Sequence, residues 1–352
     1  MKNNHLHIDF KLNGNSFSTS DELILFSKEL TKSTHQFFID WFSDVDFIEV
    51  KTSGSTGKPK TIQIKKEFMI NSALATGEFF DLKEKTSALL CMSTDFIAGK
   101  MMLLRALVLG WNLDIVEPIS KPLELTKKEY DFSAMVPLQL QNSLSEINRV
   151  KKLIVGGGII SEELVSKMQY LSNKIFATFG MTETVTHIAV KQLNGFKNTT
   201  SSELEKSHYI TLPNISITKD TRNCLVINAP NITESKIITN DVVEIISKNK
   251  FKWLGRFDNV INSGGIKLHP EEIEKKLSRI IPQRFFVAGV QDANLGEKLV
   301  LIIEGKKTSL LFSKVKNLTR FETPKAIYFV DKFIETETKK IQRNKTLDLL
   351  FK

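Results

Sequence analysis

The sequence contains only two cysteines, Cys91 and Cys224, in 352 residues. They lie far apart and show no metal-ligand spacing, so neither a disulfide framework nor a zinc site is predicted. Long apolar runs are missing as well. The first residues, MKNNHLHIDF, lack the apolar stretch of a secretory signal, and the most apolar later run, Met101 to Trp111, is interrupted by Arg105. We therefore expect a soluble cytoplasmic protein without stable membrane insertion.

Acidic residues are outnumbered by basic ones, 40 against 49, which gives a formal net charge of +9. Such an excess can attract nucleic acid, an anionic membrane or anionic small molecules. The basic residues are scattered among acids and no nucleic-acid-binding module accompanies them. We expect a solvated, lysine-rich surface and no nucleic-acid partner. The sequence leaves the oligomeric state open, a homo-oligomer included.

Apolar segments that end at turn-forming residues indicate an α/β fold. We predict strands at 87–93, 152–155, 174–179 and 224–228, and a helix at 97–109 that follows the first of them. The strand at 152–155 runs into three glycines, and the strand at 174–179 runs into Gly180. In α/β proteins ligands tend to bind at loops beyond strand ends, so these glycines mark candidate sites.

The character of the chain changes after Arg256. Pro270 begins a predicted amphipathic helix with Ile273, Leu277 and Ile280 on one face, and the predicted strands FFVAGV and KLVLIIE follow. The chain is also longer than one typical domain. We predict a large N-terminal domain of layered sheets and helices, residues 1–257, and a small mobile α+β domain, residues 258–352.

A stretch rich in hydroxyl groups, glycine and lysine, TSGSTGKPK, follows the predicted strand IEV. Glycines let backbone amides approach an anion, hydroxyls donate hydrogen bonds and lysines supply charge, so the stretch can bind phosphates. Its spacing differs from the GxxxxGK[ST] P-loop, and a flexible surface turn is the alternative. The candidate phosphate ligands are Thr52, Ser53, Gly54, Ser55, Thr56, Gly57 and Lys58.

The same stretch resembles the phosphate-loop signature of the adenylate-forming family, which includes acyl-CoA synthetases, luciferases and peptide-synthetase adenylation domains. A second motif, FGMTET, resembles the family's aromatic-Gly-x-Thr-Glu segment. The resemblance implies that Phe179 and Gly180 lie at the nucleotide, with the Phe179 ring near the adenine. It implies catalytic roles for Thr182, near the phosphates, and for Glu183, the ligand of Mg²⁺. ATP, Mg²⁺ and coenzyme A are the implied cofactors.

Two later segments resemble the ribose and hinge motifs of the family. Asn240 and Asp241 match the segment whose Asp holds the ribose hydroxyls, and GRFDNVINSGGIKLHPEEIE, which begins at Gly255, contains the implied ribose contact Arg256. The resemblance implies a domain rotation about a hinge near Asp258. It also implies that Gly264 and Gly265 let the backbone approach the pantetheine arm of coenzyme A, with a plain β-turn as the alternative.

The C-terminal stretch TETKKIQR resembles the family's last motif, in which a lysine reaches the carboxylate and the α-phosphate. Lys340 occupies that position and is the implied catalytic lysine. Lys339 stands where the family usually has glycine, so the choice between the two lysines stays open.

The sequence departs from the family pattern around the phosphate loop. Lys51 stands where an aromatic residue often precedes the loop, and Thr61 stands where glycine often follows it. The stretch before Thr52 is shorter than usual, which implies that part of the N-terminal subdomain is reduced or absent.

Two segments, VKKLIVGGGIISEEL and FIAGKMMLLRALVLG, resemble o-succinylbenzoate–CoA ligases of menaquinone synthesis. That resemblance implies a dicarboxylic acid, with Gly156 near the acid and Gly157 near the nucleotide. A second carboxylate in a buried pocket requires a cation. The candidates are Lys100, Arg105 and His187. The two cations are five residues apart on one predicted helix and do not share a face, so at most one lines the pocket. A surface position for each cation and a core position for His187 are the alternatives.

We therefore expect a ligase that activates a carboxylic acid as its adenylate and passes the acyl group to coenzyme A, with o-succinylbenzoate as the acid. A ligase for another acid or for a carrier protein is the first alternative. A protein that binds nucleotide or acyl-adenylate without turnover is the second.

Overall fold

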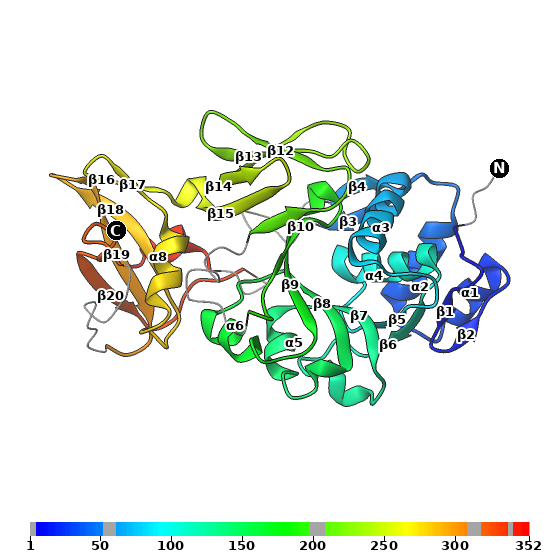
Figure 1. Ribbon diagram of the computed structural model, residues 1–352. Helices are drawn as coiled ribbons and strands as arrows, with labels where there is room; N and C mark the ends of the chain where they lie inside the picture. The colour runs from blue at the N-terminus through cyan, green and yellow to red at the C-terminus, as the bar shows by residue number, and fades with distance from the viewer. Residues whose placement is uncertain (1–4, 52–60, 197–207, 308–317, 337–340, 352) are drawn as a thin grey trace.

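The computed structural model describes residues 5–51, 61–196, 208–307, 318–336 and 341–351. Its largest element is a 13-stranded sheet with the order β12-β13-β14-β15-β11-β10-β9-β8-β7-β5-β6-β1-β2 (Figure 1). A five-stranded sheet lies at one end of the molecule, and β1, β2 and α1 lie at the opposite end. The fold is mixed α/β, as the sequence predicts.

One part of the large sheet is parallel and alternates with helices. The parallel strands are β1 (Lys11–Leu12), β5 (Ser87–Leu90), β6 (Asn112–Ile115), β7 (Tyr130–Met135), β8 (Val150–Val155) and β9 (Lys174–Gly180). The helices are α1 (Ser20–Ser27), α2 (Lys32–Phe42), α3 (Lys66–Phe80), α4 (Ile97–Leu109), α5 (Pro137–Asn142) and α6 (Glu162–Met168), with short 3-10 turns η1 (Pro122–Leu125) and η2 (Ile147–Arg149). Strands β5, β7 and β8 are each followed by a helix.

The rest of the large sheet is antiparallel. It contains β2 (Asn15–Ser16) at one edge and, at the other, β10 (His187–Gln192), β11 (Tyr209–Thr211), β12 (Ser216–Lys219), β13 (Cys224–Asn228), β14 (Ile237–Ser247) and β15 (Lys250–Arg256). The 3-10 turn η3 (Thr182–Thr184) connects β9 to β10. The junction of the parallel and antiparallel parts, β9 and β10, therefore carries the FGMTET segment.

A separate hairpin pairs β3 (Phe47–Lys51) with β4 (Thr61–Lys65). Lys51 and Thr61, which flank residues 52–60, are register partners at its end. The predicted strand IEV belongs to β3.

The small sheet begins directly after β15. The 3-10 turn η4 (Phe257–Asn259) leads into β16 (Ile261–Ser263), β17 (Ile266–Leu268), α8 (Pro270–Leu277), β18 (Phe285–Asp292), β19 (Gly296–Glu304), β20 (Ala326–Val330) and α9 (Arg343–Leu347). Buried side chains form two core clusters with members between residues 10 and 251 and two with members between residues 261 and 333.

The local predictions are confirmed with small changes at the ends. Helix α4 spans the predicted residues and ends where Gly110 takes a left-handed conformation, with φ +69°. Strand β5 ends at Leu90, three residues earlier than predicted. Helix α8 ends at Leu277, so Ile280 lies beyond it, although its side chain packs against the same cluster. Among the described residues, none of the helices is both long enough and apolar enough to cross a membrane.

Helix α4 begins in close contact with the loop that precedes it. A Cβ on Gly99 would lie 2.2 Å from the Ser93 carbonyl oxygen, a backbone atom. We predict that Gly99→Ala lowers the free energy of unfolding by about 1–3 kcal/mol or more, because the loop or the helix must shift. Gly77→Ala is the matched control, since its Cβ would lie 3.0 Å from the end of the flexible Leu109 side chain. Urea unfolding measures both, and equal losses would contradict the prediction.

Candidate active site

The predicted ribose pair lies on adjacent antiparallel strands. Asp241 on β14 and Arg256 at the end of β15 are register partners, and Arg256 Nη1 lies 3.7 Å from Asp241 Oδ2. Trp253 Nε1 donates a 2.9 Å hydrogen bond to Asp241 Oδ1. Burial raises the pKa of Asp241, while the Trp253 hydrogen bond and the Arg256 charge oppose that rise. The result is a buried carboxylate that accepts one hydrogen bond, from Trp253, and faces a half-buried arginine.

The predicted hinge residue adjoins this pair. Asp258 Oδ2 accepts 3.4 Å hydrogen bonds from Arg256 Nη2 and from Asn240 Nδ2. Asp258 lies in η4, the turn that links the large sheet to the small one. The structure thus brings three predicted residues, Asp241, Arg256 and Asp258, into one network.

The glycines after β8 lie next to the end of β9. A Cβ on Gly156 would lie 2.3 Å from Thr178 Oγ1, and Gly157 has φ +81°. A Cβ on Gly180 would lie 2.2 Å from the Thr186 carbonyl oxygen. Glycine is therefore required at these positions by close packing and by the left-handed backbone of Gly157.

The FGMTET segment forms the end of β9 and the turn η3. Phe179 packs edge to face against Tyr209 and Phe251, with ring centroids 5.6 and 5.2 Å away. Thr182 is half-buried and Glu183 is exposed. Mg²⁺ in nucleotide sites is bound by one or two carboxylates together with phosphate oxygens, and an exposed Glu183 fits that requirement.

A strained turn follows Glu183. Val185 has φ +65° and ψ −66°, and the Thr186 amide donates a 2.7 Å hydrogen bond to the Thr184 carbonyl oxygen, which closes a γ-turn. This conformation is rare for a β-branched residue and costs roughly 1–3 kcal/mol. It reverses the chain between Glu183 and the pair Thr186–His187.

The side chain of Arg105 is buried, with 2% of its surface exposed. The guanidinium donates to Thr76 Oγ1 (3.3 Å) and to Thr186 Oγ1 (3.2 Å), and Nη2 lies 3.5 Å from His187 Nδ1. Within the described part of the chain, no carboxylate forms an ion pair with it. Burial lowers the pKa of Arg105 to about 10. The alternative that Arg105 is a surface cation is therefore wrong.

Lys100 points elsewhere from the same helix. Its ammonium nitrogen lies 5.7 Å from the centroid of the Phe37 ring on α2. Burial lowers the pKa of Lys100, and the nearby charges of Asp40 and Asp95 oppose the shift. The two cations thus occupy different surroundings, as the five-residue spacing predicts.

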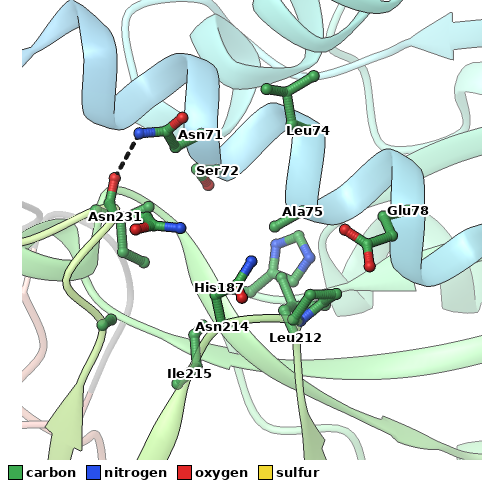
Figure 2. Close-up of a pocket in the computed structure, with 13 residues that line it drawn as sticks. Asn71, Ser72, Leu74, Ala75, Glu78, His187, Leu212, Asn214, Ile215 and Asn231 are labelled. Atoms are coloured by element: carbon green, nitrogen blue, oxygen red, sulfur yellow. Dashed lines mark hydrogen bonds between the residues drawn. The ribbon is translucent and has the colours of Figure 1, made fainter.

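His187 contacts Arg105 and also lines a cavity of about 210 Å³. Figure 2 shows the imidazole below helix α3, across from Ser72 and Ala75, with Glu78 at one side of the cavity. Ser72 lines the cavity, and its Oγ lies 3.2 Å from Thr186 Oγ1. The same Thr186 hydroxyl accepts a hydrogen bond from Arg105. His187 Nε2 is buried and has no hydrogen-bond partner among the described residues. His187 is indeed a core histidine, and it also faces the cavity.

Other predicted residues are placed apart or are not described. Gly264 and Gly265 form the turn between β16 and β17, which lies away from β9 and β10 (Figure 1). The phosphate-loop candidates Thr52, Ser53, Gly54, Ser55, Thr56, Gly57 and Lys58 lie outside the described residues, as do Lys339 and Lys340.

Sequence reasoning missed several groups that build the site. Thr76 and Ser72 are four residues apart on α3, which is the spacing of one helix face, but only the tertiary structure shows that this face meets Arg105 and Thr186. Trp253 precedes Arg256 on β15. Its presence there was a weak indication of a nearby acceptor, because a buried indole N–H needs one. The strain at Val185 had no signal in the sequence.

Comparison with known proteins identifies the family. The model of the AMP-binding enzyme family matches residues 51–217. A solved structure, the acyl-CoA synthetase (AMP-forming)/AMP-acid ligase II-like protein from Dyadobacter fermentans, is 35% identical, with a TM-score of 0.62 over 94% of this chain and 99% of that one.

More distant similarities point the same way. 2-succinylbenzoate–CoA ligases from Escherichia coli K12 and Staphylococcus aureus JH9 are each 24% identical over 78% and 94% of this chain. The chain spans 62% and 72% of the length of these curated relatives. The fold also matches o-succinylbenzoate coenzyme A synthetase from Bacillus subtilis in complex with ATP and magnesium ion, with 18% identity and a TM-score of 0.71 over 94% of this chain and 82% of that one. The chain belongs to the adenylate-forming family of AMP-binding enzymes.

Proposed function

We propose that this chain is an ATP-dependent acid–CoA ligase and that its acid is o-succinylbenzoate or a close dicarboxylic relative. The observation that carries the choice of acid is the buried Arg105, which has no carboxylate partner among the residues described. Family membership and the names of the curated relatives support the choice of reaction.

The reaction consists of two displacements. An oxygen of the substrate carboxylate attacks the α-phosphorus of ATP, and pyrophosphate leaves with the electron pair of the broken P–O bond. The coenzyme A thiol, as its thiolate after losing a proton, then attacks the acyl carbon and expels AMP. Bound Mg²⁺ would neutralise charge on the phosphates. We assign Thr182 to the phosphates, Glu183 to Mg²⁺, and Asp241 and Arg256 to the ribose.

Residues outside the described ranges complete the assignment. We propose that Thr52 to Lys58 contact the phosphates. Lys51 and Thr61, the described residues on either side, are register partners in the β3–β4 hairpin. We assign Lys340 to the carboxylate and the α-phosphate in the first step. These roles follow from the family motifs.

We propose a domain boundary at residues 257 and 258, with Asp258 at the hinge. The large sheet ends with β15, the small sheet begins with β16, and the core clusters on the two sides share no member. A rotation at this turn would remove Lys340 from the active site and bring in the β16–β17 turn. Gly264 and Gly265 of that turn would then face the pantetheine arm. We place the reaction in the cytoplasm, which supplies ATP and coenzyme A.

The distal carboxylate of the acid fits the surroundings of His187. Arginine has no acceptor, so a hydrogen bond between Arg105 Nη2 and His187 Nδ1 places the lone pair on Nδ1 and the proton on Nε2. The Nε2–H group is then a buried donor without a partner among the described residues. A carboxylate oxygen there would accept from Nε2 and gain the field of the Arg105 cation. An unpaired buried donor and an unpaired buried cation both favour such an anion.

The experiment that tests the reaction class is acid-dependent exchange of labelled pyrophosphate into ATP. We expect exchange with o-succinylbenzoate in the wild type, a loss of about a hundredfold or more in Lys340→Ala, and a change of less than about threefold in the control Lys339→Ala. Transfer of a supplied acyl-adenylate to coenzyme A should survive in Lys340→Ala. If no acid supports exchange in the wild type, the protein is a nucleotide-binding protein without turnover and the proposal fails.

The pocket assignment predicts a selective defect in Arg105→Lys. Lysine keeps the charge but cannot reach three acceptors in the planar geometry of a guanidinium. We expect KM for o-succinylbenzoate to rise by about tenfold or more, and KM for a benzoate-like monocarboxylate to change by less than about threefold. Lys100→Met is the control and should leave the ratio of the two KM values unchanged. An equal rise for both acids in Arg105→Lys would discard the assignment.

The environment of His187 predicts a pH dependence of stability. Burial, and to a lesser extent the Arg105 charge, lower the pKa of His187 well below its ordinary value. The unfolded chain takes up the proton near pH 6.5 and the folded chain does not, so the contribution is full above about pH 6.5 and is lost as pH falls below it. The difference in unfolding free energy between wild type and His187→Gln should therefore shrink by up to about 1.4 kcal/mol per pH unit below that point. Urea unfolding at several pH values measures it, and a constant difference would contradict the assignment.

A further inference from the structure

Arg222 joins the β12–β13 turn to the ribose and hinge segments. Its Nε donates to Asp220 Oδ2 (2.8 Å) within the turn. Its Nη1 donates to Asn240 Oδ1 (2.8 Å), and its Nη2 donates to the Thr239 carbonyl oxygen (3.1 Å). Both acceptors outside the turn belong to β14 and immediately precede Asp241.

The same guanidinium contacts the hinge turn. Its central carbon lies 5.2 Å from the centroid of the Phe257 ring, a distance at which a cation is attracted to an aromatic face. Phe257 is the first residue of η4 and is 36% exposed, so the Arg222 side chain covers part of an otherwise open ring. Arg222 therefore contacts Asn240, which precedes Asp241 in the sequence, and Phe257, which follows Arg256.

Arg222 also sets the orientation of the Asn240 amide. A guanidinium is only a donor, so the atom that faces it must be the amide oxygen, and the amide nitrogen must point the other way. The nitrogen donates to Asp258 Oδ2, which also accepts from Arg256. Arg256 in turn faces Asp241. A chain of contacts thus runs from Arg222 through Asn240 and Asp258 to the ribose pair.

The ion pair within the turn does not account for this placement. The Arg222–Asp220 ion pair is partly exposed, and pairs of that kind contribute about 0–1 kcal/mol. The turn itself is held by Asp220 Oδ1, which accepts from the backbone amides of Arg222 and Cys224. These bonds do not involve the Arg222 side chain, so the turn should persist when that side chain is changed.

We propose that Arg222 is a positioning residue for the nucleotide site: through Asn240 and Phe257 it holds Asp258 and Arg256 in place against Asp241. The inference rests on the proposed function, because Asp241 and Arg256 are assigned to the ribose there. The side chain acts through its neighbours and does not itself need to touch the nucleotide.

The test uses Arg222→Lys in the full chain. Lysine retains the charge but cannot bond Asn240 and Thr239 together while stacking on Phe257. We expect the dissociation constant for AMP, measured by calorimetry, and KM for ATP to rise by about three- to tenfold, with kcat for adenylate formation at saturating ATP within about twofold. Hydrogen exchange of the amides at 257–259 should also become faster, because the turn has lost an anchor.

Two further variants separate positioning from a general effect. Arg149→Lys is the matched control, since the Arg149 guanidinium also donates to two backbone carbonyls, those of Leu123 and Thr126, in a different part of the fold. It should leave AMP affinity unchanged. Asn240→Ala should weaken AMP binding, and its combination with Arg222→Lys should cost less than the sum of the two single changes.

The outcomes distinguish this inference from the proposed function. A wild type that binds neither AMP nor ATP would overturn both. If the wild type binds AMP, then unchanged affinity in Arg222→Lys, an equal loss in Arg149→Lys, or full additivity with Asn240→Ala would overturn the positioning role alone.

Discussion

The arrangement of the proposed acid pocket depends on one constraint, the burial of the Arg105 guanidinium. A buried cation is costly unless it is hydrogen-bonded and paired with an anion. Here α3, the turn before β10 and β10 itself supply neutral acceptors from Thr76, Thr186 and His187. The described residues supply no carboxylate. The fold thus supplies neutral hydrogen-bond partners to the cation, and the proposed function assigns its charge to the substrate carboxylate.

At the residues assigned to the ribose, by contrast, the charged groups have partners within the protein. Asp241 is buried but has Trp253 and Arg256 as partners within the protein, and Asp258 has Arg256 and Asn240. The γ-turn at Val185 lies between the nucleotide side and the acid side of the proposed site, because only Thr184 and Val185 separate Glu183 from Thr186, the neighbour of His187. In the proposed function, its strained backbone lets one short segment serve both the phosphates and the acid. A site that must join an acid to a nucleotide requires that proximity.

Sequence reasoning was most successful where one segment determines the outcome. The apolar period predicted α4 to the residue, and β13 was predicted with both ends. The motifs placed Asp241, Arg256 and Asp258 in one region, and the structure brings them into contact. The sequence offered Arg105 as a candidate cation of a buried pocket but left a surface position open, because a lone arginine in an apolar helix can also extend to the surface. The partners of Arg105 and His187 come from segments up to 82 residues away, and no local pattern identifies such contacts.

The measurement that tests the account most directly is the affinity of the wild-type protein for a sulfamoyl analogue of o-succinylbenzoyl adenylate, compared with the same analogue carrying a methyl ester on its distal carboxylate. Both compounds offer the same adenosine to Asp241 and Arg256, so calorimetry isolates the contribution of the distal charge. The account predicts that the free acid binds about tenfold more tightly or better. Equal affinities, or tighter binding of the ester, would contradict the claim that Arg105 and His187 receive a carboxylate.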